Sequence, residues 1–361
     1  MNNSFAEIFS LDVLLGMLDS YYPRLLTQID RDPDSPTYGS CDRAFWMYRL
    51  HDFDSGVLQQ AGLTFAALAT LAESADLSRC RYLSADKKPY WEELARAINR
   101  RTLADFGRGG MVDEYYPGEQ SFPATVFAGY ATLRAALMLG QTEVLQSSAL
   151  RKTAETLLAR IPSPTANQDA AGAAFLALYS HALNWEPQRA QATVKQLVTR
   201  PEQGGNFFEY GGADLGYATV TLNYLGYLQA DGGFSTADQL LALGDLIAAF
   251  ITPSGNLGGE FASRSTTYFL PFGFLQAARL NPALAARFAH LDLQSAYARL
   301  DDRYLMHYCL PALARAALDL AQCGAPELEP ASTPPGWLIR NFPDVHLVAC
   351  HKPNSVFLAG L

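Results

Sequence analysis

The chain has 361 residues, a net charge of -9, 17% charged residues and 49% hydrophobic residues. The charged fraction lies below the ~25% that is usual for soluble domains, so the chain buries much of its surface and is not a disordered acidic or basic segment. Because no run of Lys or Arg exceeds two residues, neither a nucleic-acid backbone nor an anionic bilayer is an expected partner.

The N-terminal segment shows no secretion signal, because no positive charge precedes its apolar stretch and Asp12 and Asp19 interrupt that stretch. No segment approaches ~18 consecutive apolar residues, so membrane insertion is not expected. The five cysteines are scattered without a CxxC spacing, which predicts neither a disulfide framework nor a cysteine-rich zinc site. We therefore expect a reduced, cytoplasmic chain with no metal site and no cofactor, and we leave its oligomeric state open.

Apolar periodicity predicts one helix after another before residue 340. Amphipathic helices are expected near 5–20, 89–104, 142–160, 187–199, 236–251 and 282–300. After each of them a more uniformly apolar helix, rich in small residues, is expected to begin near Ser55, Ser121, Asn167, Asp214, Ser265 and Asp302. Internal glycines in these apolar helices cost about 1 kcal/mol each, so close helix contact is the expected compensation. Six outer and six inner helices in alternation predict an all-α fold, an (α/α)6 toroid over residues 1–323. An open solenoid is the alternative.

The composition changes after Cys323. Four prolines follow within a short stretch, at 326, 330, 334 and 335, and they predict a linker over 324–340. Two short apolar runs within 341–361, separated by Lys352-Pro353-Asn354, predict a β-hairpin stub. Two strands do not make an independent domain in water, so this stub either begins a β domain or packs back onto the helices.

Polar and aromatic residues gather before the inner helices, and the densest cluster contains Glu209, Tyr210, Asp214 and Tyr217 beside glycines. Carboxylates, phenols and flat rings are what a sugar-binding surface needs. The alternative is that Asp214 only caps the helix that follows it. A pair of carboxylates such as Glu209 and Asp214 would also suit a glycoside hydrolase if their separation allowed it.

A second cluster, at 258–268, contains Glu260, Arg264 and Tyr268. Arg264 suits a bidentate contact with a carboxylate of the substrate. It could equally form a structural ion pair with Glu209, Asp214 or Glu260.

Three further segments supply candidate ligands. Asn167 and Gln168 place two carboxamides at a helix start, where Asn167 could bind substrate or only cap the helix. Glu119 lies in a similar polar stretch before Ser121, and Arg43 and His51 lie in a long irregular segment that we expect to fold over the mouth of the toroid.

The run FFEYGGADLGYATVTLNYL, together with NQDAAGA upstream and GGEFASRSTTYFLPFG downstream, resembles the helical region of heparinase II/III-like proteins, which are polysaccharide lyase relatives. The earlier segments TYGSCDRAFWMYRLHDF and EYYPGEQSFPATVFAGYA are similar to the same family. The resemblance covers most of residues 20–325.

This resemblance implies a toroid followed by a β-sandwich and cleavage of uronic-acid glycosides by β-elimination. It implies that Asn167 neutralises the substrate carboxylate with Gln168 beside it, and that Tyr217, or else Tyr210, is the base or acid. Arg264 completes the predicted catalytic group. Glu209, Asp214, Glu260, Tyr268, Arg43, His51 and Glu119 are predicted to bind the acidic polysaccharide or oligosaccharide. The family uses a further His, in some members from the β-sandwich, of which 341–361 resembles only the start.

Two other functions stay open. The first is a catalytically silent glycan-binding or assembly factor in exopolysaccharide biosynthesis, favoured by the short β region. The second is a toroid like those of terpene cyclases and prenyltransferases, suggested by the single motif QADGGF at 229–234. If the substrate is acidic, Arg43, Arg49, Arg264 and Arg303 are expected to make the cleft positive within an acidic protein.

Overall fold

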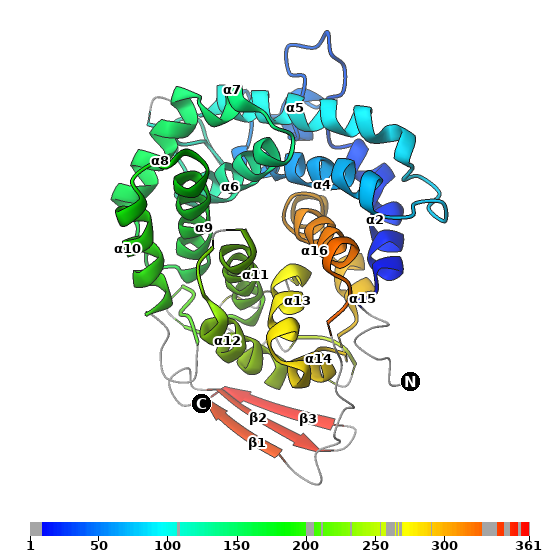
Figure 1. Cartoon of the computed structure of the whole chain (residues 1–361), viewed down its shortest axis with the longest axis vertical. Helices are drawn as coiled ribbons and strands as arrows, with labels where there is room; N and C mark the ends of the chain where they lie inside the picture. Colours follow the sequence, from blue (N-terminus) through cyan, green and yellow to red (C-terminus); the bar gives the residue numbers. More distant parts are fainter. Residues whose placement is uncertain are drawn as a thin grey trace.

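The computed structural model describes residues 9–106, 109–199, 206–210, 212–231, 233–252, 254–257, 264, 266, 269–289, 291–326, 338–342, 347–352 and 355–360. Within these residues the helices form two concentric rings, and a small sheet lies outside the rings next to α12 and α14 (Figure 1). No helix among the described residues combines the length and hydropathy needed to cross a bilayer.

The inner ring consists of six described helices that follow one another in the chain. Each of them contacts the next, and the last contacts the first, so the ring closes (Figure 1). This closure distinguishes the toroid from an open solenoid. The inner helices are α4 (Ala61–Ser74), α6 (Phe122–Met138), α9 (Ala166–Leu183), α11 (Leu215–Asp231), α13 (Pro271–Leu280) and α16 (Leu310–Cys323).

The outer ring also has six principal helices within the described residues. Five of them contact an inner helix adjacent in the chain, whereas the first, α2, contacts α16 and so joins the two ends of the helical region. The outer helices are α2 (Leu11–Leu26), α5 (Lys88–Asp105), α8 (Ser148–Arg160), α10 (Pro187–Val198), α12 (Ala237–Ala249) and α14 (Pro282–Phe288). Short elements between them are α3 (Arg43–Trp46), η1 (Gly56–Gln60), η2 (Ala85–Lys87), α7 (Thr142–Leu145), α15 (Leu293–Ala298) and the π-helical turn η4 (Tyr304–Cys309).

The two rings differ in the pattern of their buried residues. The outer helix α10 buries Ala190, Thr193, Val194 and Leu197, a spacing that places one apolar stripe against the inner ring. The inner helix α9 is buried on all sides over most of its length, because it has neighbours in both rings. Small side chains make this crowding possible. A Cβ at Gly273 of α13 would lie 2.5 Å from the backbone of Leu222 in α11, so only glycine fits there.

The C-terminal strands form an antiparallel sheet in the order β1 (Leu338–Phe342), β2 (Leu347–Lys352) and β3 (Ser355–Gly360). Leu347 and Ala349 of β2 are buried. Arg340 of β1 forms an ion pair with Asp245 of α12, and Asp245 also pairs with Arg287 of α14. These contacts attach the sheet to the outer ring.

The predicted fold class is confirmed: the described chain is mostly helical, arranged as a toroid of helix pairs, with short antiparallel strands at the C-terminal end. The strand region contains one strand more than the predicted hairpin, because β1 begins at Leu338, inside the range 324–340 predicted as linker. The polar pair Arg340-Asn341 concealed this strand. Its stability comes from pairing with β2 and from Asp245, which are tertiary contacts that local propensity does not encode.

Candidate functional site

The loops that precede the inner helices meet at one end of the ring, which we call the ring entrance. Backbone hydrogen bonds join neighbouring loops: Gly56 N donates to the carbonyl of Asp113 at 2.8 Å, and Ala166 N donates to the carbonyl of Phe208 at 3.3 Å. The irregular segment before α4 takes part in this end of the ring, as expected. The predicted site residues therefore divide between the α9/α11 side and the α4/α16 side of the entrance.

Asp214 caps α11 and binds the loop that leads to α13. Its Oδ1 accepts hydrogen bonds from Tyr217 N at 3.0 Å and from the Thr266 hydroxyl, while its Oδ2 accepts one from Arg264 N at 2.9 Å. The side chain is buried. Helix capping was the alternative to substrate binding for this residue, and the geometry agrees with capping.

Glu209 is a second buried carboxylate and is 0% exposed. Its Oε2 accepts from Asn167 N at 3.2 Å and from Asn167 Nδ2 at 2.7 Å, and its Oε1 accepts from Thr221 Oγ1 at 2.6 Å. Burial raises the pKa of Glu209 to about 7, although the hydrogen bonds from Thr221 and Asn167 oppose this rise. Glu209 thus joins the starts of α9 and α11 from the inside.

The buried positions of these groups limit what they can do. Asn167 is 1% exposed, and its amide is directed to Glu209 rather than to the entrance. A hydrolase that used Glu209 and Asp214 as its two carboxylates would need both to reach a sugar, and the structure buries both. In this conformation the three residues hold the loops in place.

Tyr210, Tyr217 and Arg264 form a group at the surface of the same side, which we call the tyrosine platform. The two rings lie 5.1 Å apart between centroids. The Arg264 guanidinium lies 4.4 Å from the centroid of Tyr210 and 6.0 Å from that of Tyr217. Gln168 Nε2 lies 3.5 Å from the Tyr210 hydroxyl. Among the described residues no carboxylate forms an ion pair with Arg264, so the structural pair with Glu209 or Asp214 that we considered is not present.

The α4/α16 side contains a cleft of about 390 Å³. Its lining combines charged, aromatic and apolar residues from the segment before α4, the loop before α6 and the start of η4. The lining residues are Gln28, Cys41, Asp42, Arg43, Ala44, His51, Phe53, Ser55, Leu58, Glu114, Tyr115, Asp302, Arg303 and His307. Of the predicted ligands, Arg43 and His51 lie here.

Each carboxylate of this cleft lies beside a basic side chain. His51 Nε2 lies 3.3 Å from Asp42 Oδ2, and His51 Nδ1 donates to the carbonyl of Phe53 at 2.6 Å. Glu114 pairs with Arg303, and Asp302 pairs with Arg24.

Of the two arginines that line this side, Arg303 pairs with Glu114, so only Arg43 lacks a carboxylate partner among the described residues. Arg43 differs from Arg303: its guanidinium lies 5.0 Å from the ring centroid of Tyr48, and its Nε lies 3.2 Å from Met47 Sδ.

Tyr308 lies between the two sides. Burial raises the pKa of its phenol well above the usual value, and the charges of Glu114 and Tyr217 raise it further while Arg303 lowers it. Residues from both sides of the entrance therefore act on this phenol.

Glu114, Asp302 and His307 were not among the predicted site residues, whereas Arg303 was expected as one of the cations of the cleft and does line it. His307 is 2% exposed, and burial, helped by the charge of Arg303, lowers its pKa to about 3. The i, i+4 spacing of Arg303 and His307 was a usable signal, since it places two polar groups on one helix face in an otherwise apolar segment. The π-helical turn η4 that carries them is a second feature often found at functional sites.

Of the remaining predicted ligands, only Glu119 lies among the described residues, and it supports a loop. Glu119 Oε2 accepts from the backbone N–H of Glu114 at 3.0 Å and of Tyr115 at 2.8 Å, so it supports the loop before α6. Glu260 and Tyr268 lie outside the described residues.

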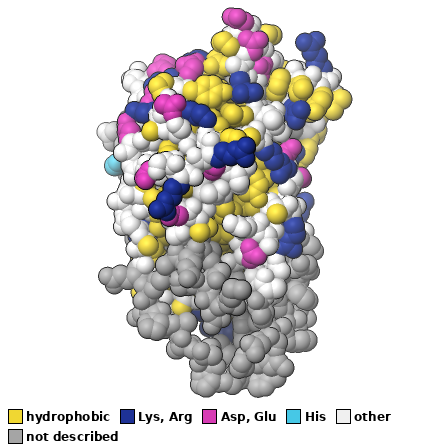
Figure 2. Space-filling view, turned by 90° about the vertical axis from the view of Figure 1, so that its right-hand side faces the viewer, with side chains coloured by type: hydrophobic (Ala, Val, Ile, Leu, Met, Phe, Trp, Pro, Cys, Tyr) yellow, Lys and Arg dark blue, Asp and Glu magenta, His cyan; other side chains and the backbone are white. Residues whose placement is uncertain are grey.

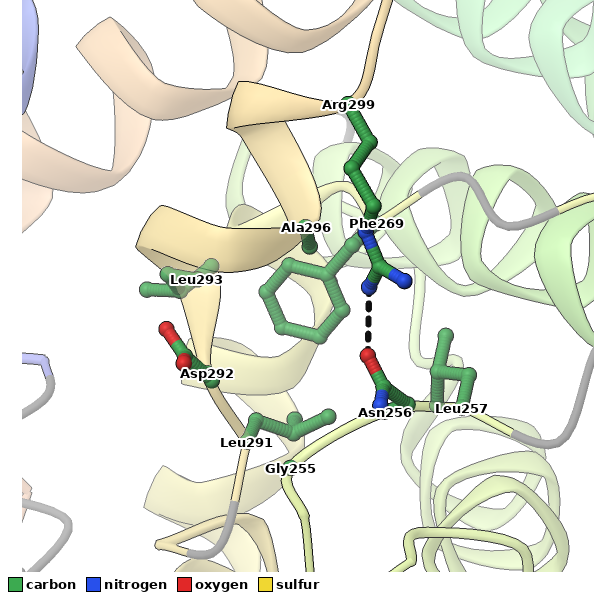
Figure 3. A pocket seen from close by; sticks show the side chains of 9 residues that line it. All are labelled: Gly255, Asn256, Leu257, Phe269, Leu291, Asp292, Leu293, Ala296 and Arg299. Carbon is green, nitrogen blue, oxygen red and sulfur yellow. Dashed lines mark hydrogen bonds between the residues drawn. The ribbon is translucent and has the colours of Figure 1, made fainter.

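Two other features that the structure describes differ from these sites. A second hollow, beside α15, measures about 20 Å³, is floored by Phe269, Leu291 and Leu293, and is crossed by a hydrogen bond from Arg299 to Asn256 (Figure 3). It has room for a single water at most. Gln229 of the cyclase-like motif accepts from Thr236 N at 2.7 Å, which gives it a structural role at the end of α11.

Surface charge and metal-ligand geometry add no further site. On the side of the molecule where α2 lies, positive and negative side chains are interspersed without a large patch of one sign (Figure 2). In the part of the chain that the structure describes, no group of three or more His, Cys, Asp or Glu residues is arranged to hold a metal ion.

Comparison with known proteins adds no relative: no family model matches the chain, and no curated protein matches it.

Proposed function

We propose that the ring entrance binds an acidic polysaccharide or oligosaccharide, and that the chain is a polysaccharide lyase-like enzyme of the kind that the heparinase II/III resemblance implies. The tyrosine platform carries this proposal. It presents one guanidinium and two phenols together at the surface of the entrance, and the buried carboxylates Asp214 and Glu209 hold the loops that position them.

β-Elimination at a uronate requires three functions that this group can supply. A cation neutralises the C6 carboxylate so that the C5 proton becomes acidic, and Arg264 is suited to a bidentate contact of this kind. A base then removes the C5 proton, the double bond forms between C4 and C5, and the C4–O bond breaks. In the proposal the Tyr217 phenolate accepts the C5 proton, and the Tyr210 hydroxyl protonates the departing oxygen.

The role of Asn167 changes in this scheme. Because its amide donates to Glu209 inside the protein, Asn167 is a positioning residue that holds the start of α9 against the loop of Tyr210. Gln168, which follows it and lies beside the Tyr210 hydroxyl, is then the carboxamide that meets a substrate hydroxyl or carboxylate.

The burial of Asn167 also favours a second function, namely glycan binding without catalysis in exopolysaccharide assembly. A lyase whose carboxylate-neutralising Asn is turned inward has only Arg264 and Gln168 left for that step. The same platform would still bind a uronate by charge and by stacking, and it would not cleave it.

The deciding experiment follows the ultraviolet absorbance of the unsaturated ends that β-elimination creates on a panel of uronate polysaccharides. Tyr217→Phe should lower turnover about 100-fold or more, the usual contribution of a general acid or base, with an unchanged melting temperature. Tyr90→Phe is the matched control, because it removes a phenol hydroxyl from the outer helix α5 and should leave turnover intact.

Three outcomes discriminate between the functions. Full turnover by Tyr217→Phe contradicts its role as base. No absorbance change with any polysaccharide, combined with uronate binding that Arg264→Ala weakens, supports the binding function. Neither cleavage nor binding by the folded protein contradicts both.

A further inference from the structure

Two buried polar atoms in the cleft have no hydrogen-bond partner among the described residues: His307 Nδ1 and Ser55 Oγ. Both residues line the cleft. Ser55 immediately precedes η1, His307 lies in η4, and these two elements are in contact. Buried polar groups are nearly always paired, and an orphaned one has a substantial desolvation cost. Two such atoms beside one cleft of about 390 Å³ mark a place where a bound ligand would complete their hydrogen bonds.

The hydrogen bonding of His307 fixes what this ligand must offer. Its imidazole hydrogen-bonds the backbone of Leu58, and since Nδ1 has no partner, Nε2 is the nitrogen that donates to that carbonyl. The proton then resides on Nε2 and Nδ1 presents a lone pair. Burial keeps the pKa of His307 near 3, so the ring is neutral around pH 7. The ligand must donate a hydrogen bond to Nδ1, as a hydroxyl does.

The charges of the cleft indicate a neutral ligand. Glu114 pairs with Arg303, Asp302 pairs with Arg24, and Asp42 lies beside His51. The guanidinium of Arg43 lies over the ring of Tyr48. An added carboxylate or ammonium group would have to compete with one of these contacts. Tyr115 adds a flat face at the edge: its ring is exposed and lies 4.9 Å from the Arg303 guanidinium. The volume falls in the range of small-molecule sites.

We propose that the cleft is a binding site for a neutral sugar residue, one hydroxyl of which donates to His307 Nδ1 while Ser55 Oγ hydrogen-bonds the same or a neighbouring hydroxyl. The choice of a sugar as the ligand rests on the proposed function of the entrance. The inference adds that the glycan carries a neutral residue at the α4/α16 side when a uronate occupies the tyrosine platform. As a weak base, His307 binds and orients this residue and does not remove its protons.

The test uses the full chain with histidine labelled by nitrogen-15 and four probes: methyl glucopyranoside, methyl galactopyranoside, methyl mannopyranoside and methyl glucuronoside. At least one neutral glycoside should shift the Nδ1 resonance of His307 in a saturable way, as expected for a lone pair that gains a hydrogen bond. Ser55→Ala should weaken this binding about fivefold, the loss expected for one hydrogen bond. His307→Phe should abolish it.

Arg264→Ala separates this inference from the proposed function. It should leave the neutral glycoside titration unchanged and weaken the binding of methyl glucuronoside. If His307→Phe does not fold, Ser55→Ala and the Nδ1 resonance of the unaltered chain still decide the matter. An Nδ1 resonance that no neutral glycoside shifts, or equal affinity in Ser55→Ala, overturns the inference. Neutral-glycoside binding without any β-elimination overturns the lyase function alone.

Discussion

The two sides of the ring entrance contain the same kinds of side chain and use them differently. On the α9/α11 side, Glu209 and Asp214 are buried and accept hydrogen bonds from backbone N–H groups, an amide and hydroxyls. On the α4/α16 side, Glu114 and Asp302 pair with arginines and Asp42 lies beside His51. The first arrangement leaves the guanidinium of Arg264 without an ion pair among the described residues, and the second engages the guanidinium of Arg303.

This difference shows that the partner of a carboxylate decides the electrostatics of a site more than the count of charges does. A carboxylate that accepts neutral donors in the interior holds loops together and does not occupy the N–H groups of a nearby guanidinium. A carboxylate that pairs with an arginine cancels its charge. This difference is why we propose a uronate for the platform and a neutral sugar for the cleft, although two arginines, Arg43 and Arg303, line the cleft and only Arg264 belongs to the platform.

Among variants that test this difference between the two sides, we expect the largest effect on the free energy of unfolding from a change at Glu209. Glu209→Ala removes the acceptor of the Asn167 amide and the Thr221 hydroxyl, leaves both buried without partners and opens a cavity. We expect it to lower the free energy of unfolding by about 3–5 kcal/mol, as measured by denaturant titration.

Glu114→Ala is the matched change on the other side. Its partner Arg303 is partly exposed and can be solvated by water when the carboxylate is lost. We expect a cost of about 1–2 kcal/mol. Equal costs for the two variants would show that the Glu209 hydrogen bonds do not hold the α9/α11 side together.

The contribution of Glu209 to the free energy of unfolding should also depend on pH. The pKa of Glu209 is raised from 4.5 to about 7 in the folded protein, so the folded state binds this proton more tightly than the unfolded chain does. The contribution is favourable below pH 4.5 and is lost as pH rises through 7, at about 1.4 kcal/mol per unit of pKa difference. Over this window the folded protein should therefore lose about 3 kcal/mol relative to Glu209→Gln, which does not titrate.

Comparing the unaltered protein with Glu209→Gln isolates the titration of Glu209. Asp54 and Asp105 also have raised pKa values, of about 6 and 8, and their effects cancel because both proteins contain them. A difference in the free energy of unfolding that stays constant between pH 4.5 and 7.5 would contradict the assignment to Glu209.

The fold was accessible from the sequence because its signals are local and repeated. Outer helices such as α10 face the core on one side and carry one apolar stripe. Inner helices such as α9 have neighbours in both rings and are rich in apolar residues on all faces. Gly273, which no other residue can replace at its contact with Leu222, marks an inner helix in the sequence. The strand β1 was missed because Arg340 is stabilised there by Asp245, nearly a hundred positions away in the chain.

The site was accessible only in part. Tyr210, Tyr217 and Arg264 were recognised because aromatic and charged residues cluster at helix starts, and the structure places them together. Burial could not be read from the same clusters, so Asn167, Glu209 and Asp214 were expected to touch substrate. The pairing of Arg303 with Glu114 and the orphaned Nδ1 of His307 depend on ring closure, which brings η4 beside loops that are far away in sequence.

The smallest predicted effect concerns Tyr210, whose φ of 55° lies in the left-handed region, an unfavourable conformation for a bulky side chain. Asn tolerates this region better, so Tyr210→Asn should raise the free energy of unfolding by about 1 kcal/mol while it lowers uronate affinity, because the guanidinium of Arg264 loses the ring on which it lies. Tyr210→Phe keeps the ring and should change neither quantity appreciably. Denaturant unfolding and uronate titration of both variants test this prediction. Opposite changes in stability and binding would mean that the strained backbone is maintained for the ligand, whereas a joint loss would mean that the Tyr210 side chain only stabilises the fold.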